Sequence, residues 1–220
     1  MIRLLFITFL SLILFDCAPT RFVEPLHKGQ KAVGLNFGGP VIDFAGATIP
    51  IPFTSVYGGY GLTRDLTLYT GLHLTAAAYK TLQLDLGATY RLLPQYRYRP
   101  SVGMGAAINS ITALPSGVSR FFPQIDLHMH WDYAAKWRTY LGASSWLDFY
   151  SRQRQSTDTY RLSVFNFYMG QTFKLSKQWE LNLEYKWLDP WDRNDRTVVH
   201  YVHWSDKGAQ GLYFNVIYKW

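Results

Sequence analysis

Residues 81–93 read Thr-Leu-Gln-Leu-Asp-Leu-Gly-Ala-Thr-Tyr-Arg-Leu-Leu, and from Leu82 to Leu92 every second side chain is apolar or aromatic. In an extended chain, alternate side chains point to opposite faces. One face is therefore oily, and the other is polar and charged, carrying Gln83, Asp85, Thr89 and Arg91. A period of two residues predicts a β-strand whose two faces meet unlike surroundings.

The same alternation recurs along the rest of the chain in segments of about ten residues. It is clear in residues 66–75, 123–133 and 179–187, and weaker in residues 31–37, 53–61, 101–111, 138–149 and 160–173, with a last segment at 211–220. The links between segments alternate between short and long, apart from a short link at residues 76–80. This spacing predicts about ten antiparallel strands in up-and-down order, with short turns at one end and long loops at the other.

The composition of the chain excludes several classes of protein. Its 220 residues are 48% hydrophobic and 17% charged, too apolar for disorder, and a mean hydropathy of -0.09 does not suit a helical membrane protein. The formal net charge is +7, but the basic residues come singly or in short groups, so we predict no nucleic-acid partner. A single cysteine excludes an intramolecular disulfide.

The polar face distinguishes a closed barrel from a soluble sandwich, which also alternates. It combines small residues, Gly71, Gly87, Gly103, Gly105, Gly142 and Gly170, with a predicted polar network of Asp85, Arg91, Asp126, His128, His130, Arg138, Glu184 and Lys186. Such a mixture suits a narrow lumen, where glycine leaves room for large neighbours. Hydrocarbon offers no partner to backbone N–H and C=O groups, so strands cross it only when every edge is paired.

Aromatic side chains are expected at both ends of this barrel, because they favour the boundary between lipid and water. The set predicted for the short-turn end is Tyr96, Tyr98, Tyr133, Trp137, Trp179 and Trp220. The set predicted for the long-loop end is Trp146, Phe149, Tyr150, Tyr160 and Trp187. Two such belts are typical of a barrel that spans a bilayer. Core aromatics of a sandwich are the alternative.

The final segment carries an unbroken apolar face that ends on a terminal aromatic, formed by Leu212, Phe214, Val216, Tyr218 and Trp220. It resembles the C-terminal strand signal that the assembly machinery recognises in bacterial outer-membrane barrel proteins. The resemblance implies a small outer-membrane β-barrel, located in the bacterial outer membrane. It also implies two kinds of partner, outer-membrane lipid, with lipopolysaccharide, and the barrel-assembly machinery.

The N-terminus predicts export. A short basic start and an apolar run over residues 4–15 suit a signal peptide of residues 1–16. Cys17 follows directly, which resembles the lipid-attachment site of bacterial lipoproteins, although Phe15-Asp16 departs from the small residue favoured before that cysteine. Lipidation of Cys17 and an ordinary signal peptide both stay open. Residues 17–30 are predicted to be a tether, and residues 31–220 the barrel.

The row Asp126, His128, His130 and Asp132 shares one strand face and invites a metal or acid–base interpretation. Residues two apart on a strand more commonly line a lumen and pair sideways, so we predict no catalytic residue, no metal and no cofactor. The alternative is a rim hydrolase acting on lipid or peptide, with the candidates Asp148, Asp189, Asp192, His200 and His203. His200 and His203 are also candidates for a metal site with Asp206, although surface loop histidines usually bind no metal. Arg152, Arg154 and Arg161 are candidates for contact with lipopolysaccharide phosphate.

The sequence therefore predicts an all-β, closed, antiparallel, up-and-down transmembrane barrel of about ten strands. A barrel of this size leaves at most a narrow pore, and we expect Tyr69, Arg91, His128, Arg138 and Glu184 to narrow it further. The predicted function is non-enzymatic, structural or surface-binding. The sequence does not identify a small ligand.

Overall fold

The fold is described from a computed structural model, which describes residues 20–44, 46–150, 162–193, 201–203 and 206–220. The strands are β1 (Lys31–Phe44), β2 (Ala47–Pro50), β3 (Thr54–Gly61), β4 (Leu66–His73), β5 (Thr81–Leu93), β6 (Ser101–Ala113), β7 (Ser119–Ala134), β8 (Trp137–Leu147), β9 (Ser163–Lys174), β10 (Trp179–Arg193) and β11 (Lys207–Lys219). A single short helix, α2 (Leu74–Ala78), is found among the described residues. In this part of the chain, no helix has the length and apolar character to span a bilayer.

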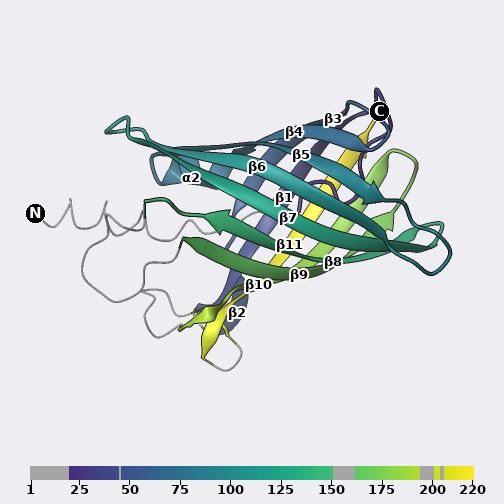
Figure 1. Cartoon of the computed structure of the whole chain (residues 1–220). Helices are drawn as coiled ribbons and strands as arrows, with labels where there is room; N and C mark the ends of the chain where they lie inside the picture. Colours follow the sequence, from purple (N-terminus) through teal and green to yellow (C-terminus); the bar gives the residue numbers. More distant parts are fainter. Residues whose placement is uncertain (1–19, 45, 151–161, 194–200, 204–205) are drawn as a thin grey trace, which may run out of the picture.

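The strands form a closed barrel (Figure 1). Each strand pairs antiparallel with its sequence neighbour, except that β1 pairs with β3 and the chain closes where β1 meets β11. At this seam Val33 lies opposite Tyr218 and Phe37 opposite Phe214. With β2 outside the ring, ten of the eleven strands enclose the lumen. The predicted closed, up-and-down, all-β fold is confirmed.

The oily face of the sheet points outward. Leu86 is 66% exposed, and Leu82, Leu84, Tyr90 and Leu92 of the same strand are also exposed. Between them, Gln83, Asp85 and Thr89 are buried on the inner face. This arrangement is the reverse of a soluble sandwich, in which leucines fill the core. The predicted class, a small transmembrane β-barrel, is confirmed by the closed ring and its apolar exterior.

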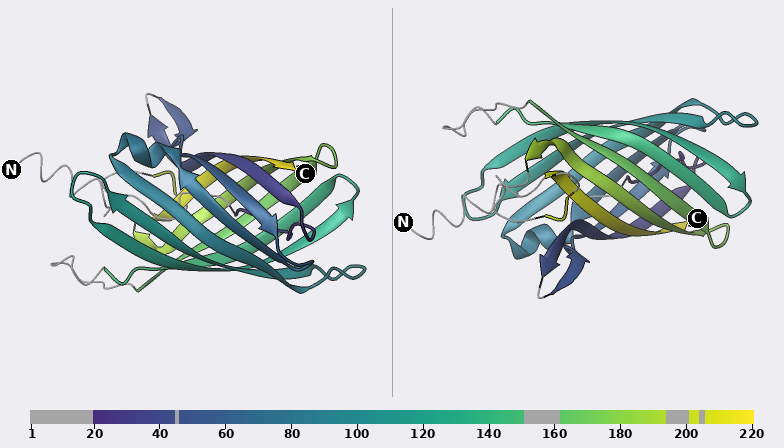
Figure 2. Two further views of the ribbon diagram at one scale, coloured as in Figure 1. Left: turned by 90° about the horizontal axis from the view of Figure 1, so that it is seen from above. Right: turned by 90° about the horizontal axis from the view of Figure 1, so that it is seen from below.

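The first long loop is more ordered than its sequence suggests. β1 runs on past the ring to Phe44 and folds back onto β2, and Figure 2 shows this hairpin projecting from the barrel wall. β1 leaves its ring partners near Gly38, which has a φ of 124°, and Pro40, which makes the last pair with β11. Proline lacks the N–H that a continuing ladder needs, and glycine allows the positive φ.

One aromatic prediction is wrong. Trp146 was expected in the belt at the long-loop end, but its side chain is buried on the inner face, 6.0 Å from the ring of Phe122. The residues of β8 that point inward are Arg138, Tyr140, Gly142, Ser144 and Trp146, and they lie two apart along the strand. The strict alternation of the strand therefore fixes the direction of Trp146, and its ring fills the lumen near the long-loop end.

Candidate functional site in the barrel lumen

The lumen wall is built from tyrosines that lie over glycines of the neighbouring strand. Tyr140 of β8 pairs across the sheet with Gly170 of β9, and Tyr168 of β9 pairs with Gly142 of β8. A β-carbon at Gly142 would lie 2.5 Å from the Tyr168 ring, so only glycine leaves room for the ring there. The predicted use of glycine to make space for large inward side chains is confirmed at these pairs.

Residues 20–26 lie inside this wall and residues 27–30 connect them to the rim, and we call the whole segment 20–30 the plug. Figure 2 shows the start of the described chain, in purple, between the strands of the barrel. The C-terminal end of the plug lies at the short-turn end of the barrel, where the Gly29 N–H donates to the Gly61 carbonyl at 2.8 Å. Deeper inside, the Leu26 N–H donates to the Thr67 hydroxyl at 2.7 Å. Residues 20–26 of the predicted tether therefore occupy the lumen, which their sequence does not indicate.

The deepest part of the plug is held by carboxylates of the wall. The Arg21 guanidinium donates to the Asp85 carboxylate at 2.6 Å and to the Ser55 hydroxyl at 2.9 Å. The Thr20 N–H lies 3.1 and 3.2 Å from the two carboxylate oxygens of Glu184. Arg21, Asp85 and Glu184 are all buried. A buried carboxylate is costly unless it is paired and hydrogen-bonded, so these contacts stabilise the plug in place.

The middle of the plug contacts the opposite wall. The Val23 carbonyl lies 2.9 Å from Nε2 of His128, whose Nδ1 lies 2.6 Å from the Asp126 carboxylate. Asp126 in turn accepts the Tyr168 hydroxyl at 2.5 Å. A histidine that is bonded at both ring nitrogens is oriented by its partners. His128 and Asp126 therefore act in this structure as anchors for the plug.

Apolar side chains of the plug fill the space that the polar contacts leave. Phe22 and Leu26 are buried in one cluster with Tyr57, and Tyr69 packs against the same cluster. The ring centroids of Phe22 and Tyr57 are 5.4 Å apart in an edge-on arrangement, which is favourable for aromatic pairs. The plug is thus packed like a core element and closes this part of the lumen.

The structure does not bring all the predicted lumen residues into one network. Asp85, His128, Glu184 and Arg138 contact the plug, and Asp126 lies behind His128, bonded to it and to Tyr168. Lys186 is buried 3.7 Å from Glu184 and lies over the rings of Tyr168 and Tyr213. Arg91 is not part of this network, because its guanidinium pairs with Asp65 at the short-turn end.

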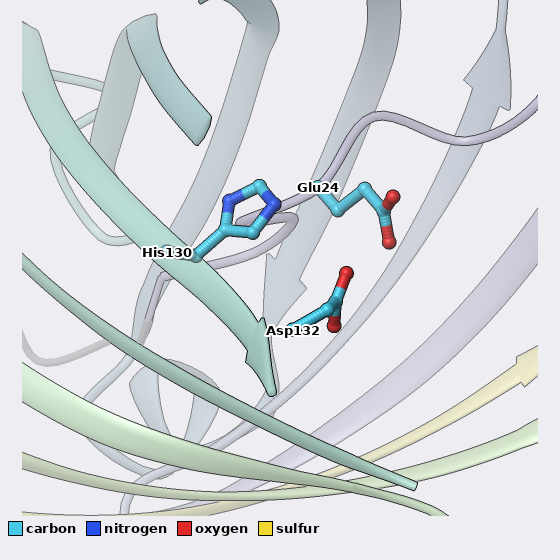
Figure 3. Close-up of side chains that lie close together, drawn as sticks. All are labelled: Glu24, His130 and Asp132. Carbon is cyan, nitrogen blue, oxygen red and sulfur yellow. The ribbon is translucent and has the colours of Figure 1, made fainter. Parts of the chain in front are cut away.

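His130 belongs to a separate cluster, which Figure 3 shows together with Glu24 and Asp132. One potential ligand atom from each of the three residues lies within 4.8 Å of the others, the spacing of a metal site. Both carboxylates already hold cations, however. Arg138 pairs with Glu24 and with Asp132, and the Lys174 ammonium lies 2.8 Å from Asp132. A divalent ion would have to displace these charges, so the cluster is better explained as an ion-pair network.

The four residues of the predicted row on β7 therefore have different partners. Asp126 and His128 form one unit that binds the Val23 carbonyl. Asp132 belongs with Arg138 and Lys174 nearer the short-turn end. His130 between them is buried, and its Nδ1 has no hydrogen-bond partner among the described residues. The row does not converge on one metal.

The rim candidates belong to separate segments: Asp148 follows β8, Asp189 lies in β10, and His203 precedes β11. Asp148 accepts the Tyr150 N–H at 2.9 Å, whereas His203 accepts the Asp206 N–H at 3.0 Å in the last loop. The Asp189 N–H donates to the Asn166 side chain at 3.3 Å. Outside the described residues or side chains lie Asp192, His200, Arg152, Arg154, Arg161 and Tyr160. The described contacts of these candidates do not assemble a nucleophile with a base.

The predicted insertion signal lies on the outer face of β11. Phe214, Val216 and Trp220 are exposed, and Leu212 and Tyr218 share their side of the strand. The residues between them, Tyr213, Asn215 and Ile217, are buried toward the lumen. The signal peptide of residues 1–16 and the acceptor Cys17 lie outside the described residues and stay predictions.

No known protein family matches the chain, and no curated protein matches it. Among solved structures, the N-terminal β-barrel domain of Pseudomonas aeruginosa OprF has 9% identity and a TM-score of 0.37, with 89% of this chain and all of that chain covered. The NanC porin has 8% identity and a TM-score of 0.44, with 86% of this chain and 98% of that chain covered. The translocator domain of the autotransporter NalP from Neisseria meningitidis has 8% identity and a TM-score of 0.45, with 88% of this chain and 89% of that chain covered.

Proposed function

We propose that the chain is a bacterial outer-membrane barrel whose own N-terminal segment closes its lumen, and that it acts as a structural or surface-binding element without enzyme activity. The observation that carries this proposal is the plug, which places Arg21, Phe22 and Glu24 against opposite walls of the lumen. The terminal apolar face of β11 and the outward leucines support a location in the outer membrane.

A closed lumen argues against bulk diffusion. A barrel of eight strands has an interior that side chains alone can fill, and ten strands leave only a little more space. Here that space holds the plug. Beyond Thr20 remains a small polar cavity lined by Asp85, Asp126 and Lys186, among others. We therefore expect no continuous aqueous path while the plug is in place.

The chemistry of the lumen supports a structural role for its ionisable groups. His128 has both ring nitrogens occupied, one by Asp126 and the other by the Val23 carbonyl of the plug. Asp85 is held by Arg21 and His73. General acid–base catalysis requires a group that can reach a substrate proton. These groups face the plug instead, so we assign them to closure.

Single-channel recording in planar bilayers tests the closed lumen. We expect the refolded wild-type barrel to give no steady conductance steps. The triple variant Arg21→Ser, Phe22→Ser, Glu24→Ser removes the side chains that hold and fill the plug, so discrete steps should appear. Lys28→Ser is the matched control, because Lys28 belongs to the same segment but is exposed at the rim; it should stay silent. Steady steps from the wild type, equal to those of the triple variant, would contradict the closed lumen.

A further inference from the structure

Basic side chains gather at the short-turn end of the barrel. Seven of them are exposed and have no carboxylate partner among the described ion pairs: Lys28, Lys31, Arg64, Arg97, Arg99, Lys136 and Lys177. We call these seven residues the collar. Three further basic residues at this end are neutralised, since Arg91 pairs with Asp65, Lys174 with Asp132, and Lys219 with Glu180.

The collar carries as many positive charges as the formal net charge of the chain. The sequence holds 22 basic and 15 acidic residues, which gives the formal net charge of +7. Without the seven collar residues, the 15 remaining basic residues balance the 15 acidic ones. At the opposite end, the described residues carry both signs, with Lys80, Arg120 and Lys207 beside Asp43, Asp148 and Asp206. Among the described residues, basic side chains therefore clearly outnumber acidic ones only at the short-turn end.

An aromatic belt lies directly beside the collar. Trp137 follows Lys136 in the chain, and Trp179 lies two residues after Lys177. Lys31 and Trp220 exchange two backbone hydrogen bonds of 2.9 Å across the barrel seam. The three tryptophans are each partly exposed on the outer face. Tryptophan and tyrosine favour the headgroup level of a bilayer, so this belt marks one membrane boundary and places the collar at the depth of the lipid phosphates.

We propose that the collar binds the headgroups of anionic phospholipids, such as phosphatidylglycerol, in the leaflet that surrounds the short turns. The proposal rests on the proposed membrane location, in which short turns face the periplasm. Lysine and arginine attract phosphate electrostatically, and arginine can also bind it in a bidentate manner. Seven positive charges in one ring would enrich anionic lipid around this end of the barrel.

Quenching of tryptophan fluorescence by brominated lipids tests this enrichment. The barrel is reconstituted into two preparations of mixed phosphatidylcholine and phosphatidylglycerol vesicles. Brominated lipid makes up the same fraction of both, but it is phosphatidylcholine in one preparation and phosphatidylglycerol in the other. Quenching should be about twofold stronger when phosphatidylglycerol carries the bromine, because anionic lipid is concentrated beside the belt. The difference should vanish at about 1 M salt, where the screening length falls to about 3 Å.

Two variants separate the collar from general effects. The collar variant Arg64→Gln, Arg99→Gln, Lys136→Gln, Lys177→Gln changes exposed turn residues only and should lose the difference between the two lipids. The control variant Lys80→Gln, Arg120→Gln, Lys207→Gln removes three positive charges at the opposite end and should keep the difference. A difference that survives in the collar variant would overturn the proposal.

The failure of this proposal is distinguishable from the failure of the proposed membrane location. Strong and equal quenching by both lipids in the wild type would place the belt in the bilayer but refute the selection of anionic lipid. The collar would then be assigned to binding an acidic periplasmic protein. Weak quenching by both lipids would refute the membrane location itself, and with it the collar proposal.

Discussion

Replacing Arg21 by methionine is expected to lower the free energy of unfolding of the barrel by about 3 kcal/mol, because the substitution leaves the buried Asp85 carboxylate without its guanidinium partner. Both side chains are about 5% exposed, so water cannot take over the lost contacts. His73 lies 3.1 Å from the same carboxylate oxygen and limits the loss. Urea unfolding of the barrel in lipid vesicles measures the change.

The Arg91–Asp65 pair provides the matched control. The distance from its guanidinium nitrogen to its carboxylate oxygen is similar, 2.5 Å, but the Asp65 side chain is 45% exposed. Exposed ion pairs contribute about 0–1 kcal/mol, so Arg91→Met should have little effect. The double variant Arg21→Met, Asp85→Leu should recover most of the stability, because it removes the uncompensated charge. Equal effects of Arg21→Met and Arg91→Met would show that Arg21 is not buried in the lumen.

Gly170→Ala is expected to destabilise the barrel by about 2–3 kcal/mol through overpacking. The added β-carbon would overlap the Tyr140 ring and lie 2.8 Å from the Leu183 carbonyl oxygen, which belongs to the neighbouring strand. Tyr140 cannot move aside without cost, because it is buried and its hydroxyl donates to Glu184 at 3.0 Å. The same urea titration gives the change in unfolding free energy.

Gly58→Ala is the control for this substitution. A β-carbon at Gly58 would meet only the Ala32 carbonyl oxygen, at the ordinary distance of 3.7 Å. Its effect should stay within about 1 kcal/mol, close to that of an unhindered surface change. If Gly170→Ala were as mild as Gly58→Ala, the close packing of tyrosine over glycine in the lumen wall would be wrong.

The ring of strands could be predicted because each strand separates lipid from a polar interior. That contrast gives residues 81–93 a sharp period of two, and the structure places Leu86 outside and Asp85 inside as expected. The strand ends beyond the membrane were harder to predict. β1 continues to Phe44 and β7 begins at Ser119, where the outer face no longer meets lipid and the alternation weakens.

The plug could not be predicted, because nothing local in residues 20–30 indicates that they enter a lumen. Arg21 and Asp85 are 64 positions apart, and Glu24 and Arg138 are 114 apart. Such pairings become visible only when the barrel has closed and its diameter is known. The one hint is chemical: the predicted wall contains the charged residues Asp85 and Arg138, and residues 20–30 contain the oppositely charged Arg21 and Glu24. The direction of Trp146 was missed for a simpler reason, because a tryptophan near a strand end suits both a belt and a lumen.

Amide hydrogen exchange of residues 20–26, followed by mass spectrometry of the refolded barrel, tests the occupied lumen most directly. The Thr20 and Leu26 N–H groups are bonded to Glu184 and Thr67 inside the barrel. We predict that peptides covering this segment exchange as slowly as those of β10 and β11, since exchange would require the plug to leave. Exchange at the rate of an unstructured chain, while the strands stay protected, would show that the segment lies outside the lumen.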